Sequence, residues 1–192
     1  MRDIVKPGLV LFVTALIAAL TLSLIREATR ETIAQNEINK RIAAMSEVLP
    51  QADGTFGETV ETGNEAGVIS YQEGLAGGQT VGYVMSVSEI GYGGTISLLV
   101  GISADGTVAD VRIIAHTETP GLGAKASDDI FLSQYTGKSG ALRVVKQAPA
   151  ANNEIQAITS ATITTTAVTN GINKALAFYE SELQTLQQGG AQ

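Results

Sequence analysis

The stretch "IQAITSATITTTAVTNGINKAL", residues 155–176, contains seven hydroxyl side chains within eleven positions, 159–169. After this cluster the apolar residues recur on one helical face. The pattern predicts a long amphipathic helix that begins near Thr164 and runs to about Leu186, where a polar tail follows. The hydroxyl cluster therefore spans the predicted start of the helix.

The hydroxyls have two possible uses at that helix start. Ser and Thr side chains accept hydrogen bonds from the first unpaired N–H groups of a helix, and Thr159 or Ser160 is the expected cap. A hydroxyl within the first turn, such as that of Thr162, would also suit a phosphate ester, because the positive end of the helix dipole attracts anions. The pattern is compatible with both uses.

Composition excludes several classes of function. The chain has 192 residues and a formal net charge of -7, which argues against nucleic-acid binding because such proteins present a basic surface to the phosphates. There is no cysteine, so disulfides, thiol nucleophiles and cysteine-ligated iron–sulfur clusters are excluded. A single histidine, His116, argues against a zinc or haem site, and no metal site is expected. Any redox chemistry must come from a bound cofactor.

The N-terminal part predicts a membrane anchor. Residues 8–25 contain no charged side chain and as a helix would reach about 27 Å, close to the thickness of the hydrocarbon core. The alternative is a secretory signal peptide, because Arg2 and Lys6 precede the apolar run, but that run is longer than usual and meets Arg26 directly. We expect a single-pass protein of the cell membrane with its main domain on the extracytoplasmic side, although basic residues on both flanks leave the orientation nearly open.

The chain after the anchor predicts a stalk and one domain. Residues 27–47 lack Gly and Pro and are rich in helix-forming residues, so they predict a helix that continues from the membrane. The expected organisation is an N-terminal tail and transmembrane anchor, a helical stalk, a compact domain and a polar tail, with the limits 1–26, 27–50, 51–187 and 188–192.

The main domain predicts an α+β fold with an antiparallel sheet and flanking helices. Its strands are short β-rich runs separated by Gly-rich turns. They are expected at 67–73, 79–89, 94–103, 106–116 and 141–147. A short helix is predicted at 126–135 with Ser127 as its cap.

Two Gly-rich segments are candidate ligand loops. The segment "GYGGTIS", residues 91–97, lacks the Lys of a phosphate-binding loop and the glycine order of a dinucleotide site, so a tight turn explains it better. The segment "HTETPGLGAKA", residues 116–126, combines Pro120 with Gly121 and Gly123, which lets the backbone fold tightly and lie flat against a planar ligand. By composition alone it also fits an ordinary loop.

Taken together, the hydroxyl cluster and the Pro–Gly loop resemble the FMN-binding domain family, whose members carry FMN through a phosphoester to threonine. The family motif is Asp-x-x-Ser/Thr-Gly-Ala-Thr, and residues 156–162 of this chain stand in its places. The resemblance implies that Thr162 bears covalent FMN and that the "ETPGLG" loop, residues 118–123, lies near the isoalloxazine ring. Two positions depart from the motif: Gln156 replaces its Asp and Ser160 replaces its Gly.

The resemblance also implies a set of residues around the cofactor. Besides the attachment residue Thr162, the expected FMN-binding residues come from the helix start and from the Pro–Gly loop. They are Ser160, Ala161, Thr164, Thr165, Glu118, Thr119, Gly121, Leu122 and Gly123.

The whole chain is similar to the G subunits of Rnf electron-transport complexes. The related C subunit of the sodium-translocating NADH:quinone oxidoreductase, usually a longer chain, is the alternative. The likeness implies an electron-relay subunit of an ion-translocating ferredoxin:NAD oxidoreductase, with no independent activity. Its implied partners are the other membrane subunits, a flavin transferase that attaches the FMN, and membrane lipid.

The sequence leaves two other functions open. The departures at Gln156 and Ser160 raise the possibility of a membrane-anchored assembly module that keeps the fold without the flavin. An exported enzyme could use His116 and Glu118 as acid and base, because histidine titrates near neutral pH. The sequence offers that enzyme no nucleophile or metal partner.

Overall fold

The computed structural model describes residues 11–12, 14–16, 19–21, 40–63, 67–149 and 151–185. The chain divides into two compact units, Met1–Arg41 and Ile42–Gln192. Much of the predicted anchor and stalk, and the polar tail, lie outside the described residues. Within the described residues, no helix is both long and apolar enough to cross a membrane.

A six-stranded antiparallel sheet forms the centre of the second unit. The strand order is β1-β3-β4-β5-β6, and β2 pairs with β3 beside β1. The strands are β1 (Thr55–Phe56), β2 (Val60–Glu61), β3 (Val68–Ala76), β4 (Gln79–Ile90), β5 (Thr95–Ser103) and β6 (Val108–Ala115). The predicted antiparallel meander is confirmed for β3 to β6. The two-residue strands β1 and β2 were not predicted, because two residues carry no alternation that a sequence pattern could reveal.

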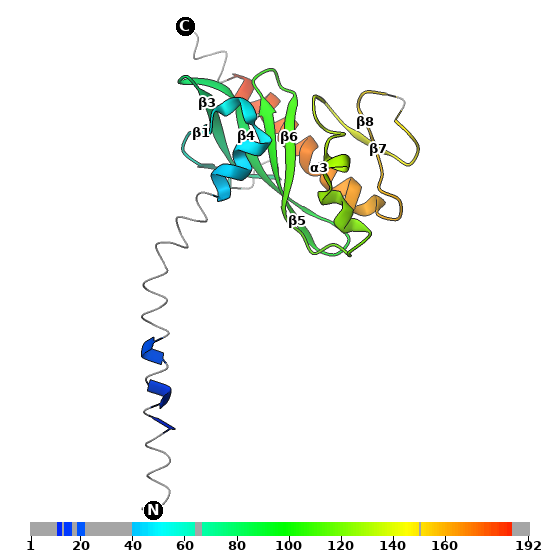
Figure 1. Ribbon diagram of the computed structural model, residues 1–192. Coiled ribbons are helices and arrows are strands. Elements are labelled where there is room, and N and C mark those ends of the chain that lie inside the picture. The colour runs from blue at the N-terminus through cyan, green and yellow to red at the C-terminus, as the bar shows by residue number, and fades with distance from the viewer. Residues whose placement is uncertain are drawn as a thin grey trace, which may run out of the picture. The chain divides into compact units, whose positions relative to one another are not determined.

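Alternating side chains of the sheet build two cores. Met85 and Val87 belong to the larger core together with the helix α3 (Thr162–Phe178), whereas Val84, next to Met85 in the strand, belongs to a smaller core on the other face. Figure 1 shows α3 in orange on one face of the sheet and residues 42–52 in cyan on the other. The sheet is therefore covered on both faces near its middle.

The end of the predicted stalk helix packs on the sheet. Residues 40–48 are helical, and a 3₁₀ turn, η1 (Pro50–Ala52), follows them. Val48 and Leu49 are fully buried in the smaller core. Gly101 of β5 permits this approach, because a Cβ placed there would lie 1.8 Å from the carbonyl oxygen of Val48. Residues 42–49 therefore belong to the compact unit and do not stand apart from it.

The helix α3 carries the amphipathic pattern of the opening stretch. Val168, Ile172 and Leu176 are buried against the sheet, and the helix continues into a π-helical turn, η4 (Tyr179–Leu183). It begins at Thr162, two residues before the predicted start. The apolar spacing of the sequence thus located the helix and its buried face correctly.

The segment between β6 and α3 forms short elements beside the sheet. These are the 3₁₀ helix η3 (Gly123–Ser127), the helix α2 (Asp129–Leu132) and the parallel pair β7 (Arg143–Val145) and β8 (Glu154–Gln156). The predicted cap at Ser127 was wrong: Ser127 ends η3, and Asp128 precedes α2 without a side-chain capping bond. The strand at 141–147 is confirmed in shortened form, whereas β8 was not predicted.

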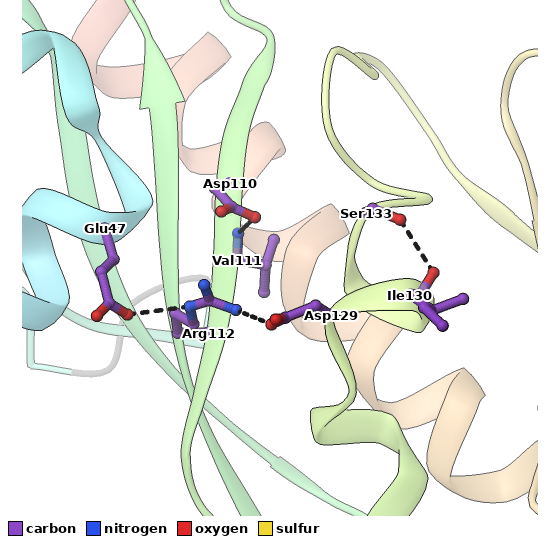
Figure 2. A network of polar contacts seen from close by, with 7 residues as sticks. All are labelled: Glu47, Asp110, Val111, Arg112, Asp129, Ile130 and Ser133. Carbon is purple, nitrogen blue, oxygen red and sulfur yellow. Dashed lines mark hydrogen bonds and ion pairs between the residues drawn. The ribbon is translucent and has the colours of Figure 1, made fainter.

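Arg112 joins three segments on the outside of β6 (Figure 2). Its Nε lies 3.1 Å from an oxygen of Glu47, in the helix of residues 40–48, and its Nη1 lies 2.5 Å from Asp129 of α2. The hydrogen bond with Asp129 is the first cause of the raised pKa of Arg112. Both carboxylates are largely exposed, so each pair adds less than about 1 kcal/mol.

Candidate functional site

A pocket of about 410 Å³ lies where the β4–β5 turn, the Pro–Gly loop and the start of α3 meet. This volume falls within the range of small-molecule sites, which is about 300–1,000 Å³. The residues that line it are Tyr92, Glu118, Thr119, Leu122, Gly123, Ser160, Ala161, Thr162, Ile163 and Thr164. Three segments that are distant in the sequence therefore share one cavity.

The start of α3 has no side-chain cap. Its N-cap residue is Ala161, which makes no side-chain capping bond, so the prediction that Thr159 or Ser160 caps the helix was wrong. The first N–H groups of a helix have no partner within the helix. They are thus available at the pocket wall for an anion, which the positive end of the helix dipole also favours.

Thr165 fixes the shape of this helix start from the buried side. Its Oγ1 donates a hydrogen bond to the carbonyl of Ala161 at 3.0 Å and accepts one from the N–H of Ile158 at 3.1 Å. The side chain is fully buried and does not line the pocket. One of the seven hydroxyls therefore serves the fold by fastening the turn before α3 to the helix.

Thr162 presents a free hydroxyl to the pocket. It is half-buried, it is the first residue of α3, and among the described residues its hydroxyl has no hydrogen-bond partner. By contrast, the hydroxyl of Thr164 is bonded to Glu118, and that of Thr165 is bonded as described above. Of these three threonines, Thr162 is the one whose oxygen is available for modification.

Ser160 adopts a backbone conformation that favours glycine. Its φ is +65°, one of two positive values for non-glycine residues among the described residues. An L-residue in this region costs about 1–2 kcal/mol relative to right-handed backbone. The motif that this segment resembles has glycine here, and the structure gives the physical reason for that preference.

Glu118 is a buried carboxylate in the pocket wall, with 6% of its surface exposed. Its Oε1 accepts a hydrogen bond from the N–H of Gly93 at 2.9 Å, and its Oε2 accepts one from the hydroxyl of Thr164 at 2.7 Å. Among the described residues, the hydrogen bond between His116 and Glu118 runs from the backbone N–H of Glu118 to Nδ1 of His116 and does not involve the carboxylate. The geometry does not form the acid–base pair that the enzyme hypothesis required.

The "GYGG" segment is a tight turn between β4 and β5, as predicted. The N–H of Gly91 donates to the carbonyl of Gly94 at 2.8 Å, and Thr117 donates its hydroxyl to the carbonyl of Gly93 at 2.9 Å. A Cβ on Gly93 would lie 2.3 Å from the carbonyl oxygen of Thr117. The glycines therefore allow the turn to pack directly against the Pro–Gly loop.

The pocket collects most of the residues expected around a cofactor. Eight of the ten line it, whereas Gly121 and Thr165 do not. Gly121 shapes the loop with a φ of +79°. Tyr92 and Ile163 also line the pocket and were missed. The signals in the sequence were an aromatic residue within a glycine turn and an apolar residue at the polar start of a helix. Whether these residues bind FMN stays a prediction.

Comparison with known proteins places the chain in a family. Residues 91–177 match the FMN-binding domain, and residues 1–48 match the RnfG N-terminal region. The G subunit of the Na(+)-translocating ferredoxin:NAD(+) oxidoreductase complex of Acetobacterium woodii is 40% identical, over 94% of this chain and 93% of that protein. The chain belongs to the RnfG family. The G subunit of the proton-translocating ferredoxin:NAD(+) oxidoreductase complex of Clostridium ljungdahlii is 36% identical, over 86% of each chain.

Solved structures outside the RnfG family share the fold. The C subunit of the Na(+)-translocating NADH-quinone reductase of Parabacteroides distasonis matches with a TM-score of 0.59 over 79% of this chain and 94% of that one, at 21% identity. Shewanella oneidensis NqrC matches with a TM-score of 0.54 over 70% of each chain, also at 21% identity. At this identity the likeness concerns the fold alone, and the NADH:quinone oxidoreductase alternative fits less well than RnfG.

Proposed function

We propose that this chain is the electron-relay subunit of a membrane-bound, ion-translocating ferredoxin:NAD+ oxidoreductase and carries FMN through a phosphoester on Thr162. Membership of the RnfG family and the match to the FMN-binding domain support the relay role. The observation that carries the attachment site is the free, half-buried hydroxyl of Thr162 in the pocket.

The chemistry of the pocket fits FMN. The uncapped start of α3 suits a phosphate group, since its N–H groups and dipole favour an anion. Tyr92, Leu122 and Ile163 line the pocket and are exposed, so they supply apolar surface for a planar ring. The pocket therefore offers both an anion-binding helix start and apolar surface, which suit the phosphate and the ring of FMN.

In this role, the chain holds and orients the cofactor. FMN supplies the ability to accept electrons and release them to the next carrier on a path between ferredoxin and NAD. Thr162 fixes the cofactor to the helix, and the packing of Thr165 against Ala161 keeps that helix start in place. A covalent ester prevents loss of the flavin by dissociation, and Thr162 itself takes no part in electron transfer.

The proposal includes a membrane location and partners. The uncharged stretch of residues 8–25 would anchor the chain, with the compact domain on the extracytoplasmic side. The other subunits of the complex would exchange electrons with the flavin, a flavin transferase would attach it, and lipid would surround the anchor. The match of residues 1–48 to the RnfG N-terminal region supports this arrangement.

The test is flavin fluorescence after denaturation. The full chain is co-produced with its complex partners and a flavin transferase, and wild type, Thr162→Ala and Thr166→Ala are compared on a denaturing gel. Thr166 is exposed on α3 and does not line the pocket, so it serves as the matched control. We expect fluorescence in wild type and in Thr166→Ala but not in Thr162→Ala.

A flavin-free assembly module is the second candidate, and the strained Ser160 together with Gln156 favours it. If the transferase fails to recognise the altered motif, the wild-type band is dark even though a control flavoprotein is labelled in the same cells. That result would remove the relay proposal and leave the module.

A further inference from the structure

The carboxylate of Glu118 is buried in the pocket wall and is surrounded by hydrogen-bond donors and backbone. Both of its oxygens accept a hydrogen bond, from Gly93 and from Thr164. A Cβ on Gly91 would lie 2.3 Å from Oε1, and a Cβ on Gly123 would lie 2.2 Å from Oε2. Glycine at both positions lets the backbone close over the carboxylate on two sides.

Within the described part of the chain, Glu118 forms no ion pair. The ion pairs found there involve Arg112, Arg143 and Lys174, and none of them includes Glu118. His116, the single histidine of the chain, meets Glu118 at the backbone, where its Nδ1 accepts the N–H of Glu118. A carboxylate that accepts at both oxygens has the bonding pattern of the ionised form.

The carboxylate also sits next to the proposed attachment site. Thr164, which donates to it, lies in the same first turn of α3 as Thr162, and all three residues line the pocket. Interactions between charges are stronger in a buried, low-dielectric wall than in water. Burying a charge is costly unless it is well hydrogen-bonded, and this site provides those bonds.

We propose that Glu118 places a fixed negative charge in the wall of the pocket and thereby lowers the reduction potential of the flavin bound there. This inference rests on the proposed function, because it requires FMN in this pocket. Electrons that enter the flavin from the preceding carrier bring negative charge, and repulsion from Glu118 makes the reduced form less favourable. Glu118 exchanges no electron with the flavin, and it acts through its fixed charge alone.

The test compares the midpoint potential of full-length wild type and Glu118→Gln, each carrying covalent FMN, by reductive titration against a reference dye. Gln has the same shape: its Oε1 can accept from Gly93, and its Nε2 can donate to the oxygen of Thr164. We expect the ratio of reduced to oxidised flavin at a fixed ambient potential to rise about tenfold, which is about 30 mV for a two-electron couple. Glu61→Gln, an exposed carboxylate on β2, is the control and should leave the ratio unchanged.

The variant Thr164→Val tests the hydrogen bond from Thr164 to Glu118 separately from the charge of Glu118. This variant keeps the carboxylate and the volume but removes one donor, and we expect it to change the ratio less than Glu118→Gln does. A Glu118→Gln variant that keeps its flavin at the wild-type potential overturns the inference, even if its thermal stability falls. A folded variant that takes up no flavin also overturns it, because the carboxylate would then serve attachment.

A second pair of variants applies if Glu118→Gln does not fold. Glu118→Asp and Glu118→Asn are both one methylene shorter than wild type and differ from each other only in charge. We expect the ratio of reduced to oxidised flavin to be about tenfold higher in the Asn variant than in the Asp variant, and equal ratios in the two variants would refute the inference. Wild type without covalent flavin would instead contradict the proposed function.

Discussion

The side-chain amide of Gln134 forms hydrogen bonds with both the N–H and the carbonyl of Gln156. Oε1 of Gln134 accepts the N–H of Gln156 at 2.8 Å, and its Nε2 donates to the carbonyl of Gln156 at 3.4 Å. The segment before the hydroxyl cluster is therefore positioned through its main chain. The side chain of Gln156 stays exposed and lines a shallow groove of about 260 Å³.

We expect Gln156→Asp to speed the attachment of flavin several-fold. The change restores the carboxylate of the motif at an exposed position and leaves the backbone bonds to Gln134 in place. Because surface substitutions usually alter stability by less than about 0.5 kcal/mol, the thermal unfolding temperature should change little. The measurement is the time course of covalent fluorescence with purified transferase and FAD, with Gln156→Asn as the uncharged control. Equal rates for all three proteins would show that the carboxylate is dispensable.

We expect Ser160→Gly to stabilise the folded chain by about 0.5 kcal/mol. Glycine relieves the cost of φ at +65°, and the greater freedom of glycine in the unfolded chain offsets part of that gain. Ser160→Ala keeps the strained backbone and removes the hydroxyl, so it should bring no gain. Urea unfolding of the three proteins measures the difference. A loss of stability in the Gly variant would mean that the Ser160 side chain makes a stabilising contact.

We expect Gly101→Ala to destabilise the domain by about 3 kcal/mol. The new Cβ would collide with the carbonyl of Val48, and backbone on both sides can move little in a packed core. Gly57→Ala is the matched control, because its Cβ would meet Glu73 at an ordinary 3.6 Å. Circular dichroism during urea unfolding reports both variants. Similar stability of Gly101→Ala and wild type would contradict the close packing of residues 42–49 on β5.

The fold should weaken in alkali because of Tyr135. Burial raises the pKa of its hydroxyl well above the ordinary value of 10, although the hydrogen bond with Thr169 acts in the opposite direction. A raised folded-state pKa means that the unfolded chain loses this proton first. Stability is then fully present below about pH 10 and falls above it, by about 1.4 kcal/mol per pH unit.

Unfolding free energies of wild type and Tyr135→Phe at pH 8, 10 and 11 check this expectation. The Phe variant should be less stable at pH 8, because Thr169 loses its buried partner, but its stability should decline less steeply above pH 10. Burial also raises the pKa of Tyr179, so a residual decline is expected in the variant. Parallel declines in the two proteins would exclude Tyr135 as the cause.

Much of the fold could be predicted because its patterns are local. Runs of β-forming residues between Gly-rich turns located β3 to β6, and helical spacing located α3 with its buried face. The misses have physical causes: β8 is three residues long and depends on pairing with β7, and the N-cap of α3 is Ala161 although Ser and Thr stand beside it. The strand β8 depends on its pairing with β7, whereas at the start of α3 the hydrogen bonds of Thr165 fix a turn that leaves Ala161 at the N-cap.

The sequence by itself determined the chemistry available to this protein: no cysteine, one histidine, a hydroxyl cluster before an amphipathic helix and a Pro–Gly loop. It could not decide which hydroxyl stabilises the fold and which stays available to a ligand, because every threonine has the same local structural propensity. The tertiary structure decided this by burial: Thr165 is bonded to the backbone, Thr164 is bonded to Glu118, and the hydroxyl of Thr162 stays free at the pocket. Long-range packing therefore gave different roles to threonines that the sequence alone could not distinguish.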